Sequence, residues 1–275
     1  MSKGHYCIII FLVLTGAWFT LRVISKSSNP KGLKISNSSN PKGLKISNSS
    51  NPQGLKISDD DYAEGSKRFL AVSQKVTPAL KASFKEKKLD WRAAIFVRVF
   101  KEEKELEIWV KNGRKFSLFQ TYDIARASGK PGPKEREGDR QVPEGFYFVK
   151  PDQMNPQSDF HLSFNIGYPN RFDTSHNRTG SFIMIHGSDI STGCLAMTDS
   201  RIEEIYTLAD AAFKGGQKLF HVHIFPFRMT DNKMEANTGH KWHSFWRNLR
   251  KGFQWFEEKE VPPNVTVKDS IYQFE

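Results

Sequence analysis

Residues 182–199 read FIMIHGSDISTGCLAMTD, and this stretch decides the fold expected for the chain. Its apolar, β-branched start is typical of a buried strand, which ends at His186. A short polar loop follows, and Gly193 then precedes Cys194. Acyl transfer by a thiol requires a base within hydrogen-bond reach and backbone N–H groups for an oxyanion, and this order can supply both. The spacing alone also fits a buried histidine and a buried thiol on either side of a turn.

The cysteine content makes Cys194 a candidate nucleophile. The other cysteine, Cys7, lies in an apolar N-terminal segment and is not expected to meet it, so that Cys194 stays unpaired. A lone cysteine accompanied by a histidine is a candidate catalytic residue. A protonated His186 beside the thiol would favour the thiolate. Gly193 has no side chain to keep a substrate carbonyl away from the main chain.

Apolar runs rich in β-branched and aromatic residues predict strands along most of the chain. They cover residues 93–100, 105–110, 115–122, 146–150, 161–166, 181–186 and 218–225. Asn112-Gly113, between the second and third runs, predicts a hairpin. A mainly β domain is therefore expected.

Helical patterns flank these strands. The region 62–89 is one of them, and Thr77-Pro78 is placed to start a second helix within it as N-cap and first position. Another helix is expected from Ser200 to Gly215, and an aromatic stripe predicts one over 240–258. The expected fold class is thus α+β, mainly β with flanking helices.

The N-terminal part of the chain has the features of an export segment followed by a linker. Lys3 is a basic start, and the run from Tyr6 to Leu21 is almost wholly apolar. A spanning helix needs about 20 apolar residues, so both a cleaved signal peptide and an uncleaved inner-membrane anchor are compatible with this run. Residues 27–59 repeat a unit three times, as SSNPKGLKISN, SSNPKGLKISN and SSNPQGLKISD. Such units lack the apolar residues for a core and predict a flexible basic linker.

These features divide the chain into parts, and the charge limits its partners. The parts are a signal peptide or anchor (1–25), the linker (26–60), N-terminal helices (61–91), a catalytic domain (92–228) and a C-terminal helical extension (229–275). The net charge of +11 favours anionic partners. No zinc-finger spacing or phosphate loop occurs, so nucleic acid is not an expected partner. The expected location is the periplasm or cell envelope, with membrane attachment if the first segment is retained.

Several separated motifs resemble one enzyme family. Residues 182–199 resemble the signature of the L,D-transpeptidase (YkuD-type) family, in which His-Gly is followed by Ser/Thr-x-Gly-Cys, and most closely its YafK-like branch. EGDRQVPEGFY (137–147) is similar to the family's EGD-x-x-x-PEG-x-Y element. FHLSFNIGYPN (160–170) is similar to the branch's F-H-L-x-F-N-x-G-Y-P-N, and Phe245-Trp246 and Pro262-Pro263 resemble its C-terminal extension.

The resemblance implies a mixed β-sandwich or barrel domain and a role for each residue of the signature. Cys194 would be the nucleophile and His186 the proton donor and acceptor. Backbone N–H groups around Gly193 and Cys194 would form the oxyanion hole. A main-chain carbonyl near Ser191 or Thr192 would orient the other ring nitrogen of His186. Neither a metal nor a cofactor is implied.

The implied substrate is the peptide bond at diaminopimelate in peptidoglycan stem peptides. In the YafK-like branch the implied activity is hydrolysis that frees a lipoprotein from peptidoglycan, whereas the broader family forms cross-links. Here Ala196 stands where many members have a carboxylate-binding arginine, which favours hydrolysis. We therefore expect substrate recognition by other residues, with these candidates: Arg136, Arg140, Arg171, Tyr168 and His161.

Three other interpretations have weaker support. The pairs His221 and His223, and His240 and His243, each share a face and could bind zinc, but no His-Glu-x-x-His pattern occurs. Glu137 and Asp139 could form the carboxylate pair of a glycosidase, although a polar turn is the preferred interpretation. The third is a non-catalytic module that binds the cell wall through its basic linker.

Overall fold

The computed structural model of the protein describes residues 59–275, with side chains from Gly65 onward. The export segment and the three repeats lie outside these residues, so their predicted roles and the predicted domain boundaries stay predictions. Within the described part, no helix is both long and apolar enough to cross a membrane.

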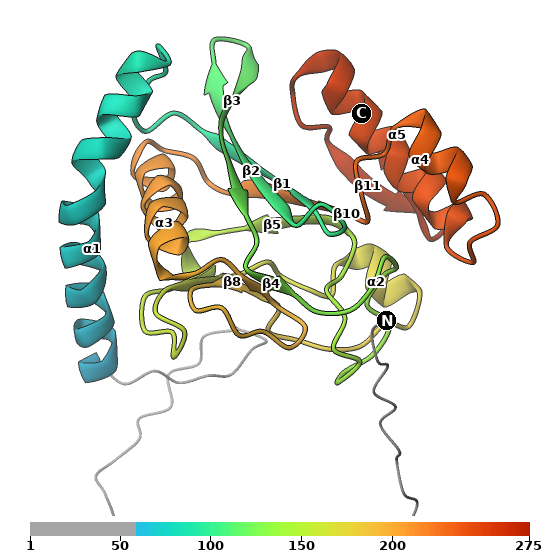
Figure 1. Ribbon diagram of the computed structural model, residues 1–275, viewed down its shortest axis with the longest axis horizontal. Helices are drawn as coiled ribbons and strands as arrows, with labels where there is room; N and C mark the ends of the chain where they lie inside the picture. Colours follow the sequence, from blue (N-terminus) through green and yellow to red (C-terminus); the bar gives the residue numbers. More distant parts are fainter. Residues whose placement is uncertain (1–58) are drawn as a thin grey trace, which may run out of the picture. The chain divides into compact units, whose positions relative to one another are not determined.

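The larger framework is a five-stranded sheet with the order β3-β2-β1-β10-β5 (Figure 1). All neighbours are antiparallel except β1 and β10, which run parallel. The strands are β1 (Ile95–Phe100), β2 (Glu105–Asn112), β3 (Lys115–Asp123), β5 (Gly145–Val149) and β10 (Phe220–Phe225). Each of the strands expected here from sequence is confirmed.

A second sheet has shorter strands and the order β4-β9-β8-β7-β6. Its one parallel pair is β8 with β9, and the other neighbours are antiparallel. The strands are β4 (Arg126–Ala127), β6 (Met154–Asn155), β7 (Ser163–Asn165), β8 (Met184–His186) and β9 (Leu195–Ala196). Among the described residues no sheet closes into a barrel, so the mainly β, α+β class is confirmed in its open, layered form.

Helices flank the strands on both sides (Figure 1). The long helix α1 packs on α3, and α3 contacts β1, β7 and β8. The C-terminal helices and a two-stranded sheet lie on the other side of the large sheet (Figure 1). The bounds are α1 (Asp59–Glu86), α2 (Arg171–Ser175), α3 (Asp199–Lys214), α4 (Asp231–Ala236), α5 (His243–Lys259), β11 (Val265–Lys268) and β12 (Ile271–Phe274), with a short 3₁₀ turn at Pro151–Gln153.

The central strand β1 is buried along its whole length because each face meets a different layer. Alternate residues from Ile95 to Val99 belong to the main core with α3. On the opposite face, the Phe96 ring lies 4.8 Å from that of Phe256, and the Phe100 ring 6.2 Å from that of Phe253. The C-terminal extension is therefore packed against the catalytic domain, and its hairpin of β11 and β12 was not expected from the sequence.

Two local expectations are wrong. No second helix starts at Thr77-Pro78, because α1 runs through Pro78 without a break. Proline inside a helix costs about 3 kcal/mol, and the burial of Leu80 and Phe84 beyond it offsets that cost. The hairpin between β2 and β3 is confirmed, but Asn112 pairs with Lys115, so its turn is shifted by one residue.

A buried carboxylate joins the extension to the catalytic domain. Glu144 is fully buried and accepts hydrogen bonds from Lys101 Nζ at 3.0 Å and from the backbone N–H of Gly132 at 2.6 Å. Its other oxygen accepts from the indole Nε1 of Trp246 in α5 at 2.8 Å. Trp246 thus helps to fix the loop that begins at Gly132.

Candidate active site

The two catalytic candidates lie on neighbouring parallel strands. His186 ends β8 and pairs with Ala196 of β9, while Ile185 pairs with Leu195. Cys194 is the residue directly before Leu195, where β9 begins. Because side chains alternate along a strand, Cys194 and Ala196 share a face with His186. The nucleophile and base expected from the sequence thus lie at one pair of neighbouring strands, with His186 at the end of β8 and Cys194 just before β9, and their catalytic roles stay predictions.

The His186 ring has one fixed nitrogen. Nδ1 lies 2.6 Å from the carbonyl oxygen of Gly187. A carbonyl can only accept, so Nδ1 carries the proton and Nε2 of the neutral ring is left with a lone pair. The prediction that a carbonyl near Ser191 or Thr192 orients the ring is wrong. The strand ends at His186, and the turn that follows places the Gly187 carbonyl beside Nδ1 instead.

Two main-chain groups hold the Cys194 thiol. The N–H of Met184 donates to Sγ at 3.4 Å, and Sγ lies 3.6 Å from the carbonyl oxygen of Phe182, to which it can donate. Burial raises the pKa of the Cys194 thiol, while the Met184 N–H and the positive charge of Lys134 act in the opposite direction. The resting side chain is therefore a thiol near neutral pH.

His186 is also uncharged in the resting site. Burial lowers the pKa of its imidazole, and the hydrogen bond to the Gly187 carbonyl only partly opposes this effect. No hydrogen bond joins the ring to Cys194 in this structure, although both residues are described. Burial disfavours both charged forms, and the imidazolium and thiolate pair expected from the sequence stays a prediction. The site is prepared for proton transfer from a thiol to a neutral imidazole.

The N–H groups expected to form the oxyanion hole have hydroxyl partners. Gly193 N–H donates to Ser128 Oγ at 2.5 Å, and Cys194 N–H donates to Ser191 Oγ at 3.1 Å. Ser191 also donates to the Cys194 carbonyl at 2.7 Å. Thr192 is exposed. Gly193 has a φ of 92°, a left-handed conformation that favours glycine. An oxyanion can use these two N–H groups only where the hydroxyls give way.

The loop between base and nucleophile is anchored at its start. Asp199 Oδ1 accepts from the N–H of Ser188 at 2.7 Å, and the N–H of Gly187 donates to the carbonyl of Phe160 at 3.0 Å. A Cβ at Gly187 would lie 2.7 Å from that carbonyl, so only glycine fits there. The Phe160 ring lies 4.8 Å from the His186 ring and is 45% exposed. Phe160 therefore forms one wall beside the base.

Two of the substrate candidates have structural roles instead. Tyr168 is buried and donates its hydroxyl to the Lys134 carbonyl at 3.2 Å. His161 Nε2 lies 3.1 Å from Glu203 Oε1, and Lys75 of α1 holds the other Glu203 oxygen at 2.8 Å. These contacts position the loops beside the site, so direct substrate binding by either side chain is not indicated by the structure.

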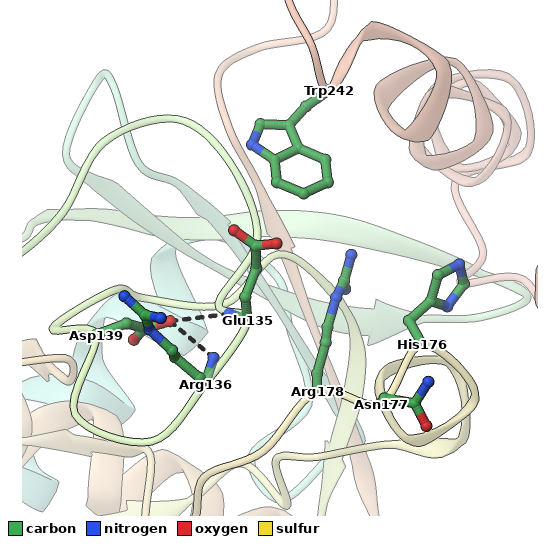
Figure 2. Close-up of a pocket in the computed structure, with 7 residues that line it drawn as sticks. All are labelled: Glu135, Arg136, Asp139, His176, Asn177, Arg178 and Trp242. Carbon is green, nitrogen blue, oxygen red and sulfur yellow. Dashed lines mark hydrogen bonds between the residues drawn. The ribbon is translucent and has the colours of Figure 1, made fainter.

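The three arginine candidates are separated. Arg140 is exposed, and its backbone lies 3.9 Å from the position of a Cβ on Gly193, next to the nucleophile. Arg171 is exposed at the start of α2. Arg136 lines a cavity of about 530 Å³ between its own loop, the segment after α2 and the start of α5 (Figure 2). The other residues lining it are Glu135, Asp139, His176, Asn177, Arg178 and Trp242.

The alternative sites are not assembled as their chemistry requires. Among the described residues, no three His, Cys, Asp or Glu side chains are grouped to hold a metal ion. His223 is fully buried in an aromatic layer. Asp139 accepts from Lys134 and from backbone N–H groups of its own loop, which fits the polar turn preferred over a carboxylate pair with Glu137.

The comparison with protein families decides the assignment. The family model described as the L,D-transpeptidase catalytic domain, YkuD, matches residues 94–250, which is more than half of the chain. This chain belongs to that family. It is therefore an L,D-transpeptidase-family enzyme, and the resemblance seen in the sequence motifs is confirmed.

One curated relative agrees with this assignment, and two solved structures show a weaker similarity. The Escherichia coli K12 protein named "Putative L,D-transpeptidase YafK" is 38% identical over 203 residues, which cover 74% of this chain and 81% of that protein. Pgp2 of Campylobacter jejuni, described as a helical cell shape determining protein, was solved as a point mutant. It is 21% identical at a TM-score of 0.41, with 61% of this chain and 57% of that one covered. Bd1075 of Bdellovibrio bacteriovorus is 22% identical at a TM-score of 0.36, with coverage of 60% and 58%.

Two features of the structure near the candidate site were not expected from the sequence. The contact of Ser128 with Gly193 joins residues 65 positions apart, and no local motif marks it. The cavity beside Arg136 depends on α5 folding back onto the loop that precedes β5. Only the motif EGDRQVPEG, already singled out at 137–145, pointed to this region.

Proposed function

We propose that this enzyme cleaves the peptide bond at diaminopimelate in peptidoglycan stem peptides through an acyl-enzyme on Cys194. The single observation that carries this proposal is the pairing of β8 with β9 within a YkuD domain, because His186 ends β8 and Cys194 directly precedes β9. The proposed location is the periplasm or cell envelope. Export and membrane attachment depend on residues 1–25, which lie outside the described part.

The proposed reaction begins from the neutral pair. Nε2 of His186 takes the thiol proton as Sγ of Cys194 bonds to the substrate carbonyl carbon. The Nδ1–H to Gly187 carbonyl contact of 2.6 Å stabilises the imidazolium that forms. Collapse of the tetrahedral intermediate breaks the carbon–nitrogen bond, and Nε2 returns the proton to the leaving amine. This leaves a thioester on Cys194.

The rim of the site is apolar on the side where a peptide would lie. Phe160, Phe182 and Ile190 are 45%, 40% and 65% exposed, and each lies in a segment that flanks His186 or Cys194. Exposed apolar side chains around a polar centre are typical of a binding surface. They support an extended peptide segment as the substrate.

For the second half-reaction we propose hydrolysis. Water gives one proton to His186 Nε2 as its oxygen bonds to the thioester carbon. The carbon–sulfur bond then breaks, Nε2 returns that proton to Cys194 Sγ, and the released acid loses its remaining proton to solvent as a carboxylate. Ala196 pairs across the strands with His186 and is fully buried, so the position offers no cation to hold a second peptide. A transferase must bind an acceptor amine and exclude water, whereas a hydrolase must admit water. Release of a peptidoglycan-linked lipoprotein is one form of this proposed hydrolysis.

The test is a product census from sacculi treated with the purified enzyme. We expect new diaminopimelate-bearing ends or freed lipoprotein, no new dimers, and loss of turnover in Cys194→Ala to background. Cys7→Ser should leave turnover unchanged. Turnover in Cys194→Ala within tenfold of wild type would contradict the nucleophile. Cys194-dependent dimers joined through two diaminopimelate residues would instead make the enzyme a cross-linking transpeptidase. If no acyl probe labelled Cys194, a non-catalytic wall-binding module would be favoured.

A further inference from the structure

The cavity in Figure 2 contains opposite charges that the fold does not use. Neither the Glu135 carboxylate nor the Arg136 guanidinium has a hydrogen bond or ion pair from its side chain within the described residues. Both side chains are exposed and both line the cavity. Both charges face solvent at the cavity and are free to pair with a ligand.

The other charged residues of the cavity hold this pair in place. Asp139 Oδ2 accepts from the backbone N–H groups of Glu135 and Arg136 at 2.9 and 3.0 Å, and Lys134 Nζ neutralises the Asp139 carboxylate at 2.6 Å. Both residues are thereby presented by a fixed turn. The charge of Asp139 is consumed within the protein, so it does not select the ligand.

Arg178 adds directed donors to the same space. Its Nη1 pairs with buried Asp173 at 2.8 Å, and the guanidinium carbon lies 5.2 and 5.0 Å from the ring centres of Phe172 and Phe245, which stack on each other at 5.3 Å. Figure 2 shows the Glu135 carboxylate and the Arg178 guanidinium both directed toward Trp242. The N–H groups of Arg178 that do not bind Asp173 are thus held rigidly at the cavity.

We propose that this cavity binds an α-amino-acid zwitterion, an ammonium and a carboxylate on one carbon, with the ammonium at Glu135 and the carboxylate at Arg136 and Arg178. A simple anion would be repelled by Glu135, and a simple cation by the two guanidinium groups. A glycan is less well matched, because Trp242 is the one indole among the described residues that line the cavity, and Lys241 Nζ covers one of its two faces at 4.7 Å.

The cavity is joined to the nucleophile through one loop, which suggests what carries the zwitterion. The loop that presents Glu135 and Arg136 continues to Arg140, whose backbone lies beside Gly193. This step rests on the proposed function: the diaminopimelate of a stem peptide has a second, free stereocentre with an ammonium and a carboxylate. Binding of that end would hold the acyl donor in place beside the nucleophile.

The experiment measures binding separately from turnover. Calorimetry on the full chain carrying Cys194→Ala would use a diaminopimelate stem tripeptide, the same peptide acetylated on its free amine, and one amidated on its free carboxylate. We expect each cap to weaken binding about tenfold, which corresponds to about 1.4 kcal/mol. Glu135→Gln should weaken the uncapped peptide by a similar factor without affecting the acetylated one. Arg136→Gln and Arg178→Lys should likewise weaken binding of the uncapped peptide by a similar factor, without affecting binding of the amidated one.

Matched variants provide the controls. Glu137→Gln and Lys130→Gln remove the same charges from exposed positions of this loop that do not line the cavity, and they should bind as wild type. Equal affinity for capped and uncapped peptides, or binding by Glu135→Gln equal to wild type, would overturn the inference. If wild type turned over its substrate but bound capped and uncapped peptides equally, the proposed function would hold and the zwitterion site would not. If it distinguished capped from uncapped peptides but formed no acyl-enzyme, the zwitterion site would hold and the proposed function would not.

Discussion

At the scale of single residues, the protonation states of Cys194 and His186 determine how the thiol reacts. Burial raises the pKa of the thiol, so at neutral pH it holds less thiolate than an exposed cysteine does. We expect iodoacetamide to alkylate Cys194 more slowly than free cysteine at pH 7. The rate should climb with pH through the raised pKa, and rates measured from pH 6 to 10 by mass spectrometry check this.

His186→Ala separates the two possible roles of the ring in the same assay. A neutral imidazole does not stabilise a thiolate, so alkylation near pH 7 should change by less than about threefold. Turnover should fall at least 100-fold, on the usual scale for a general base. The lowered pKa of His186 keeps the ring neutral, so kcat/KM should retain its value as pH falls toward about 6.5, the ordinary histidine pKa. A large drop in alkylation would restore the ion pair expected from sequence.

At the scale of elements, α1 is the first element that the structure describes. Deleting residues 27–57 should leave activity on soluble stem peptides within about twofold, because the repeats carry too few apolar residues for a core. Extending the deletion through Glu86 also removes Val72, Leu80 and Phe84, each buried and worth about 1.5–3 kcal/mol. The melting temperature should then fall by more than about 10 °C. Thermal melts and assays on both truncations check this.

A single substitution tests whether α1 also positions the wall of the site. Arg68 of α1 donates through Nη1 to the carbonyls of Ser158 and His161, at 3.1 and 2.9 Å. Arg68→Gln removes these bonds but leaves the helix core intact, so kcat should fall while the melting temperature moves little.

The truncation has its own contrary outcome. If deletion of residues 27–57 abolished activity on soluble stem peptides, the repeats would belong to the folded domain.

The elements that could be predicted are those whose signal is local. Local signals predict the longer elements, each of which has six residues or more and shows the spacing of apolar side chains typical of its type. These elements are the strands β1, β2 and β10 and the helix α3. The strands β4 and β9 have two residues each and are defined by their pairing, β4 with β9 and β9 also with β8, which no local pattern encodes. At the site, His186 and Cys194 came from a motif, whereas Ser128 came from a contact across the fold.

At the scale of the whole molecule, the large sheet separates two apolar layers, and β10 has side chains in each of them. Val222 and Ile224 belong to the layer with α3, and His223 faces the layer with α5. The His223 ring lies 4.6 Å from that of Phe96 and 4.7 Å from that of Phe146, and neither ring nitrogen has a hydrogen-bond partner. A polar ring in this position costs stability, about 1–3 kcal/mol for an unpaired buried group.

His223 therefore predicts how stability depends on pH. Burial lowers its pKa well below the ordinary value, and the nearby charges of His221 and Arg98 act in the same direction. The unfolded chain takes up a proton below about pH 6.5 while the folded chain does not, so stability is fully present above 6.5 and is lost as pH falls, by up to about 1.4 kcal/mol per unit. His223→Phe and His223→Leu should match or exceed wild type at pH 7, and their advantage should grow by about 2 kcal/mol at pH 5. Urea unfolding followed by tryptophan fluorescence at both pH values measures this difference. An advantage that stays constant with pH would mean that His223 is protonated in the folded enzyme.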